Sequence, residues 1–192
     1  GNRQPGEAPP RYIGPSTPLP ENMRAALLLR DNLRHRRTIE HAYLEGIEGA
    51  RREVLIACAY FLPGRKLTQA LCAAARRGVR VRLLLQGRVE YRLQHYAQQA
   101  LYGQFLQAGV QLHEYTPSFL HAKVAVIDEI WSTVGSSNID PYSLLFAREA
   151  NVAVIDHGFA MQLRGELERA IEHGSVAVQA PANLSIVVLD NE

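Results

Sequence analysis

Cysteine and long apolar runs are scarce in this sequence of 192 residues. The two cysteines, Cys58 and Cys72, show neither a disulfide framework nor metal-ligand spacing, so we expect buried small apolar residues and a reducing compartment. The longest apolar run, residues 54–62, is far shorter than the ~20 residues that cross a bilayer. The chain starts at Gly1, and no apolar signal segment is visible in it, so we expect an excised piece of a longer protein.

Lysine is rare as well, because the chain has only Lys66 and Lys123 beside its many arginines. The net charge is +2, but residues 1–100 hold 17 Lys and Arg against 8 Asp and Glu, whereas residues 101–192 hold 4 against 11. This asymmetry fits either solvated helix faces or a contact surface for an anionic membrane or nucleic acid. Both interpretations remain open at this point.

Proline marks the start of the chain. Six of the ten prolines lie within the first 20 residues, so residues 1–23 are expected to form an extended linker or tail. Residues 24–178 are expected to form one domain, since 47% apolar residues suffice for a core. Residues 179–192 are left as a C-terminal extension.

Hydrophobic periodicity predicts an α/β fold. Apolar runs separated by helical segments that end at glycines predict β-α-β units with parallel strands. His35 and His41 lie six apart in the first helix, which does not favour a metal pair. The expected strands are 24–29, 54–59, 79–85, 110–115 and 152–155, with 186–189 as a possible edge strand, and the expected helices are 32–49, 66–77, 92–108 and 159–173.

Residues 121–138 carry the chemistry. Residues 124–127 and 130–134 read as two strands around a tight turn near Glu129, which brings residues 135–138 opposite His121 and Lys123. Because strand side chains alternate, His121 and Lys123 share a face. The sequence therefore predicts a hairpin with its reactive groups at one end.

An imidazole, an ammonium, a hydroxyl and an amide at one edge suit a phosphate diester. His121 could attack phosphorus, while Lys123, Ser136 and Asn138 donate to the oxygens where charge develops. The alternative is a buried strand with a satisfied histidine and a polar turn. The small number of lysines favours the interpretation as a phosphate site, because one of only two lysines lies beside this histidine and places a compact point charge there.

The pattern His121-x-Lys123-x4-Asp128-x6-Gly135-Ser136-x-Asn138 resembles the HKD signature of the phospholipase D superfamily. The resemblance extends through residues 51–54, 60–63, 75–79 and 149–152, and covers roughly residues 24–178. Together these segments are similar to the second half of bacterial cardiolipin synthases of the B type. The resemblance implies a phospholipase D-like α-β-α sandwich with a mixed central sheet flanked by helices.

The resemblance also implies a function. The expected reaction is phosphatidyl transfer between two phosphatidylglycerols through a covalent phosphohistidine, with release of glycerol. The alternatives are a phosphodiesterase or nuclease with water as acceptor, and a half that is inactive without a second HKD motif. The implied partners are an anionic phospholipid, a membrane surface, and the missing N-terminal half or a homodimer mate. Nucleic acid is not an expected partner, and the implied location is peripheral, at the cytoplasmic side of the bacterial inner membrane.

Two acidic residues receive different roles. Seven residues of strand cover ~23 Å, so Asp128 cannot touch the phosphate that His121 contacts, and we expect it to cap the turn or pair with a donor near the strand end. The resemblance implies that Glu149 holds His121 in its useful tautomer. Neither a metal nor a cofactor is expected, because the cation beside the phosphate is Lys123 and no carboxylate cluster suggests Mg²⁺.

The aromatic loop after the second expected strand has two interpretations. By resemblance, Tyr60 and Phe61 border the substrate pocket. As residues that follow an apolar run, they equally fit a role as core aromatics. The residues alone leave this choice open.

Overall fold

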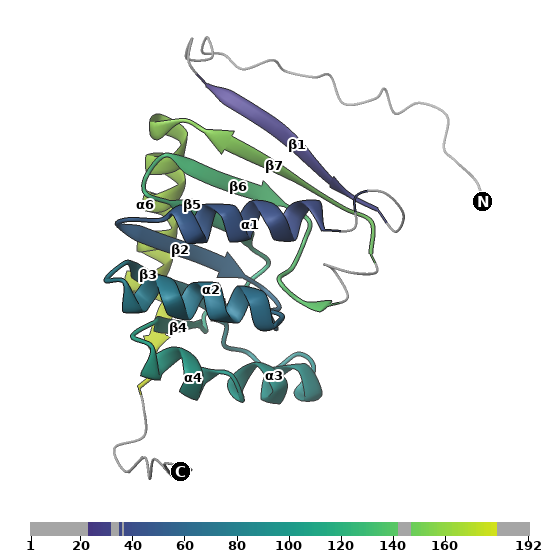
Figure 1. Ribbon diagram of the computed structural model, residues 1–192. Coiled ribbons are helices and arrows are strands. Elements are labelled where there is room, and N and C mark those ends of the chain that lie inside the picture. The colour runs from purple at the N-terminus through teal and green to yellow at the C-terminus, as the bar shows by residue number, and fades with distance from the viewer. Residues whose placement is uncertain (1–22, 32–34, 36, 142–146, 180–192) are drawn as a thin grey trace, which may run out of the picture.

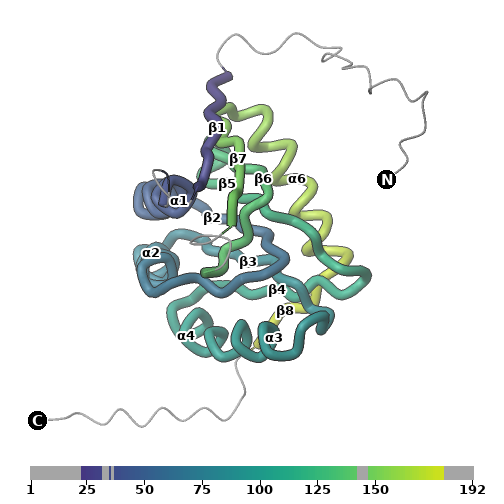
Figure 2. The backbone as a smooth tube through the Cα atoms, turned by 90° about the vertical axis from the view of Figure 1, so that its right-hand side faces the viewer, coloured from purple at the N-terminus to yellow at the C-terminus, as the bar shows by residue number. Residues whose placement is uncertain are grey.

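The protein folds into three layers, with one sheet between two layers of helices (Figure 1). The computed structural model describes residues 23–31, 35, 37–141 and 147–179. Figure 2 shows α1 and α2 on one side of the sheet and α6 on the other. This confirms the expected α-β-α sandwich. The elements are β1 (Arg24–Arg30), α1 (Thr38–Gly49), β2 (Glu53–Cys58), α2 (Arg65–Arg76), β3 (Arg80–Gln86), α3 (Arg92–Gln99), α4 (Tyr102–Gln107), β4 (Gln111–Tyr115), β5 (Lys123–Ile127), β6 (Trp131–Gly135), β7 (Glu149–Ile155), α6 (His157–Gly174) and β8 (Ser175–Ala177).

The sheet is mixed, with the strand order β1-β7-β6-β5-β2-β3-β4-β8. Strands β2, β3 and β4 are parallel, as the β-α-β pattern predicts. The helices before β3 and β4 end at Gly78 and Gly109, both with φ +89, a backbone conformation that glycine adopts without strain. The larger apolar core lies between the sheet and the layer of α1, α2 and α4, and the smaller one lies beneath α6.

The helix expected over residues 92–108 is wrong as a single element, because the chain forms α3 and α4 with a break at Ala100 and Leu101. Tyr102 and Phe105 are buried, whereas Leu93 and Tyr96 are exposed, so the apolar residues of the two helices face different ways. One straight helix cannot bury Tyr102 and Phe105 while it exposes Leu93 and Tyr96 in this way. The side chain of Gln98 bonds to the hydroxyl of Tyr102 across the break at 2.8 Å.

The other half of the sheet is antiparallel. The β5–β6 hairpin is followed by β7, which pairs with β6 and with β1. The strand expected at residues 152–155 is present, and Val152 and Ile155 in it are 40% and 46% exposed. Strand β1 is largely exposed too, so this part of the sheet has one face that the helices leave uncovered.

Several expectations concern the ends of segments. The expected first helix begins at Thr38 in the structure, and residues 32–34 and 36 lie outside the described residues. The short strand β8 was not expected. It pairs with β4 and forms one edge of the sheet. The expected linker up to residue 22 and the possible strand at 186–189 also lie outside the described residues. In the described part of the chain, no helix is long and apolar enough to cross a membrane.

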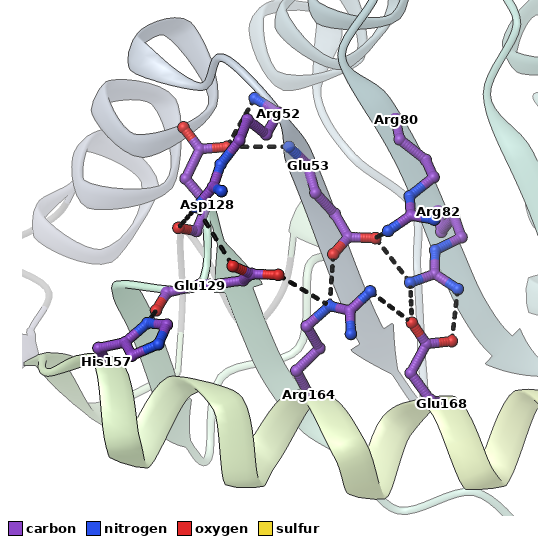
Figure 3. Close-up of polar contacts among 9 residues, drawn as sticks. All are labelled: Arg52, Glu53, Arg80, Arg82, Asp128, Glu129, His157, Arg164 and Glu168. Atoms are coloured by element: carbon purple, nitrogen blue, oxygen red, sulfur yellow. Dashed lines mark hydrogen bonds and ion pairs between the residues drawn. The ribbon is translucent and has the colours of Figure 1, made fainter.

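A cluster of charged side chains ties α6 to the first residues of β2 and β3 (Figure 3). The guanidinium of Arg82 donates to the carboxylates of Glu53 at 2.6 Å and Glu168 at 2.5 Å, and Arg164 donates to Glu53 at 2.6 Å. Burial opposes ionisation of Glu53, but the bonds from Arg164 and Arg82 outweigh it and lower the pKa of that carboxyl. Because Arg164 and Glu168 belong to α6, these bonds hold the helix against the first residues of the two strands.

Candidate active site

The β5–β6 hairpin places the histidine segment at the edge where β2 and β6 end. Its turn lies at Asp128 and Glu129, whose φ angles of 51° and 60° are typical of a two-residue hairpin turn. Lys123, at the start of β5, lies opposite Cys58, the last residue of β2. The N–H of Ala59 donates to the carbonyl of Ala122 at 2.9 Å and holds the segment there. The predicted hairpin is therefore confirmed.

The imidazole and the ammonium are adjacent. Lys123 Nζ lies 3.4 Å from His121 Nε2, and because an ammonium can only donate, Nε2 is the acceptor in this arrangement. Lys123 is 8% exposed, whereas His121 is exposed. The pair thus combines a ring that a ligand can reach with a cation held in the protein, which is the arrangement needed to attract an anion to the imidazole.

The hydroxyl of Ser136 binds the strand after it. Its Oγ donates to the carboxylate of Glu149 and accepts the N–H of Ala150 at 3.1 Å. Between these two described residues and His121 the structure places no hydrogen bond, so the implied bond from Glu149 to the histidine is not formed here. The Glu149 carboxylate instead accepts the Ser136 hydroxyl. An orienting role for Glu149 toward His121 stays a prediction.

The amide of Asn138 lies next to a buried thiol. The Cys58 sulfur lies 4.0 Å from Asn138 Oδ1, accepts the N–H of Ile139 at 3.3 Å and donates to the carbonyl of Tyr60 at 3.1 Å. Burial raises the pKa of Cys58 to about 12, so the group is a neutral thiol. The expectation of a buried cysteine is confirmed, but its hydrogen bonds were missed because strand pairing brings these residues together.

Asp128 lies at the opposite end of the hairpin. Its carboxylate accepts the backbone N–H groups of Arg51, Arg52 and Glu53, each at 2.8 Å. Burial opposes its ionisation, but these bonds outweigh it and lower the pKa of Asp128. The residue thus joins the turn to the start of β2, at the end of the strand away from His121, which is the kind of position expected for it.

The two residues of the aromatic loop have different environments. Phe61 is 1% exposed and packs against Phe105, so it is a core aromatic. Tyr60 is half-buried and donates to Glu90 at 2.5 Å, and burial together with this acceptor raises the pKa of Tyr60 to about 12. Only Tyr60 remains a candidate for the pocket border.

The walls of the site offer space on one side. A cavity of about 550 Å³ is lined by Ser136 and Glu149 together with Arg30, His35 and Arg148. Within the described residues, no group of three His, Cys, Asp or Glu side chains could hold a metal ion. The lining thus mixes two arginines, Arg30 and Arg148, with two carboxylates, Asp31 and Glu149.

Comparisons with known proteins identify the family. The model of the family described as "Cardiolipin synthase, PLD-like domain" matches residues 43–171. Cardiolipin synthase B of Escherichia coli K12 is 44% identical over 170 residues, which cover 88% of this chain and 38% of that protein. Cardiolipin synthase A of Pseudomonas putida F1 is 37% identical over 131 residues, which cover 68% of this chain and 27% of that protein. The chain thus spans less than half the length of the curated relatives it matches.

Solved structures show the same fold. Nuc from Salmonella typhimurium, described as a phospholipase D family member, superimposes with a TM-score of 0.69 at 18% identity, covering 82% of this chain and 99% of that chain. NucT from Helicobacter pylori gives 0.68 at 20% identity, covering 81% of this chain and 99% of that one. With a family model that matches most of the sequence and relatives of high identity, the chain belongs to the phospholipase D-like domain family of the cardiolipin synthases.

Proposed function

We propose that this chain supplies one catalytic half of a cardiolipin synthase, which transfers a phosphatidyl group from one phosphatidylglycerol to another and releases glycerol. The observation that carries the proposal is the His121–Lys123 pair, with 3.4 Å between Nζ and Nε2, in a chain that is 44% identical to cardiolipin synthase B. A diester phosphate needs a nucleophile and a fixed positive charge, and the pair supplies both.

The reaction proceeds in two displacements. In the first, His121 Nε2 forms a bond to phosphorus, the bond from phosphorus to the glycerol oxygen breaks, and a proton from an acid completes the leaving glycerol. In the second, a hydroxyl of another phosphatidylglycerol loses its proton to a base, attacks phosphorus and releases the imidazole. The ammonium of Lys123 stabilises the charge on the phosphate oxygens, and Ser136 and Asn138 are the proposed neutral donors.

The proposal requires a second imidazole. One histidine cannot act as nucleophile and as acid in the same step, and the sequence has only one His-x-Lys motif. The partner group would come from the remaining part of a longer protein, since this chain spans 38% of cardiolipin synthase B, or from a second copy of the chain. We therefore expect the isolated chain to be inactive as a monomer.

The proposed place of action is the cytoplasmic surface of the bacterial inner membrane, as a peripheral protein. The substrate is itself a bilayer lipid, so the enzyme has to reach it at a membrane surface. The test of location is fractionation: salt or alkaline washes should release the full-length protein from membranes, and protease added outside spheroplasts should leave it intact.

The test of the reaction uses phosphatidylglycerol vesicles and the full-length enzyme that contains this chain. We expect cardiolipin and glycerol as products and, for His121→Asn and Lys123→Met, a loss of at least about 10³-fold in rate with an unchanged melting temperature. His41→Asn, which removes an exposed imidazole of α1, is the matched control and should keep full rate. Phosphatidic acid as the main product, or hydrolysis of single-stranded DNA, would instead identify water as the acceptor.

A further inference from the structure

Five large apolar side chains are exposed at the edge of the sheet that carries the histidine. Four of them lie in the β3–α3 connection and in α3, and the fifth lies in the loop before His121. We call this group the rim patch. Its members, with exposed fractions, are Val89 (51%), Tyr91 (59%), Leu93 (86%), Tyr96 (64%) and Phe119 (55%).

The rim patch is held in place from beneath. Gln98, on the inner side of α3, is 5% exposed and bonds to the Tyr102 hydroxyl, so this polar side chain faces inward. Leu93 and Tyr96, one turn apart, consequently face outward. A helix that buries a glutamine and exposes a leucine in this way is typical of one whose outer face meets an apolar environment.

Arg88 connects the two parts of the rim patch. Its guanidinium donates to the carbonyls of Thr116 and Pro117 at 2.7 and 2.6 Å and lies 5.9 Å from the ring centre of Phe119. These contacts join the β3–α3 connection to the loop that leads into the histidine. Phe119 is therefore exposed on a loop that the hydrogen bonds of Arg88 hold in place.

The rim patch lies beside the reacting group. Phe119 precedes His121 by two residues, and the N–H of Leu120 donates to Gln86 Oε1, at the end of β3, at 2.9 Å. Figure 2 looks onto this edge of the sheet and shows α3 below the strand ends. A surface that touched the rim patch would thus also meet the entrance to the site.

A second exposed apolar area has a different composition. Leu27 and Leu29 of β1 and Val152 of β7 are aliphatic side chains exposed on neighbouring strands of the sheet. Such a surface suits a packed protein partner. The rim patch instead combines tyrosines, a leucine and a phenylalanine with the exposed Arg92, a composition that suits a lipid headgroup boundary.

We propose that the rim patch is the surface by which the protein docks onto an anionic phospholipid bilayer, with Leu93 and Tyr96 entering the acyl boundary and Arg92 contacting lipid phosphates. The choice of an anionic bilayer rests on the proposed function, because phosphatidylglycerol is the proposed substrate. Docking by this surface would bring the headgroup layer to the level of His121. The enzyme then reaches its substrate without extraction of the lipid from the bilayer.

The test measures partition onto vesicles separately from chemistry. Vesicles of phosphatidylglycerol and phosphatidylcholine are sedimented with the full-length protein, as the parent and as Leu93→Ser/Tyr96→Ser. We expect the double variant to partition about 10- to 100-fold more weakly, because two apolar side chains are lost from the boundary. Arg92→Gln should weaken partition about fivefold on phosphatidylglycerol and leave binding to pure phosphatidylcholine unchanged. Met161→Ser, exposed on α6, is the matched control and should partition like the parent.

Further measurements separate this proposal from its alternatives. Turnover of a short-chain, water-soluble phosphatidylglycerol should be unchanged in the double variant, because docking is not needed for a soluble substrate. Unchanged vesicle binding by a folded double variant would overturn the docking proposal, and so would a change of oligomeric state in sedimentation, which would assign the rim patch to a protein interface. A parent that binds vesicles through the rim patch but forms no cardiolipin would contradict the proposed function alone.

Discussion

Replacement of Asp128 should destabilise the fold while the chemistry of folded protein persists. A hydrogen bond with a charged partner contributes about 1.5–3 kcal/mol net, and Asp128 accepts three from backbone N–H groups at 2.8 Å. Arg51 and Arg52 are exposed, so water can replace part of what is lost, and we expect Asp128→Ala to cost about 2–4 kcal/mol in the free energy of unfolding. The left-handed φ of 51° adds about 1 kcal/mol, because alanine tolerates that conformation poorly.

Asp128→Asn separates charge from geometry. Asparagine keeps one acceptor oxygen and tolerates the left-handed turn, so the expected cost is smaller, about 1–2 kcal/mol. The assay is urea unfolding followed by fluorescence of Trp131, together with turnover of the full-length enzyme at a temperature where each variant is folded. Glu166→Gln, which removes a carboxylate from an exposed ion pair of α6, is the control and should unfold like the parent. Unchanged unfolding energies with abolished turnover would refute the structural role of Asp128.

Three further predictions concern stability at low pH, substitutions of two glycines, and the effect of chelators on the rate. The fold lowers the pKa values of Asp128, Glu53 and Glu168. The stability that these carboxylates contribute to the folded state is therefore fully present above pH ~4.5 and is lost as the pH falls through the lowered pKa values. Urea unfolding midpoints that stay constant from pH 7 to pH 3 would contradict this. Gly135→Ala should cost about 1–3 kcal/mol in thermal unfolding, because a Cβ would overlap the Asn151 carboxamide, whereas Gly103→Ala meets nothing within 4 Å and should be neutral or slightly stabilising. Chelators should leave the rate on phosphatidylglycerol unchanged, because the proposed cation beside the phosphate is an ammonium of the chain; a loss restored by a divalent ion would contradict the mechanism.

Local patterns sufficed for the layout of the elements. The run at residues 54–59, the glycines at 78 and 109 and the paired runs around Glu129 each predict a feature that the structure contains. These features depend on neighbours in sequence or on strand periodicity, so a single sequence carries them. The same reasoning separated Asp128 from His121, because strand length alone sets that distance.

Features that depend on contacts between distant residues were not predictable in the same way. The bonds of Cys58 to the Asn138–Ile139 segment need the pairing of β2 with β5, and the bond from Ser136 to Glu149 needs that of β6 with β7. One missed feature did have a signal. Arg82 occupies a position within an apolar strand, and a buried arginine requires acidic partners, which Glu53 and Glu168 provide.

The charged side chains at the two ends of the β5–β6 hairpin have different kinds of partners. At the turn, the Asp128 carboxylate accepts backbone N–H groups, and beside it Arg82 of β3 bonds to the carboxylates of Glu53 and Glu168. At the other end, the Lys123 ammonium lies 3.4 Å from the His121 ring, and the carboxylate of Glu149 accepts the Ser136 hydroxyl. An anion is therefore favoured at the His121 end, and substitutions at the turn should change stability before they change chemistry.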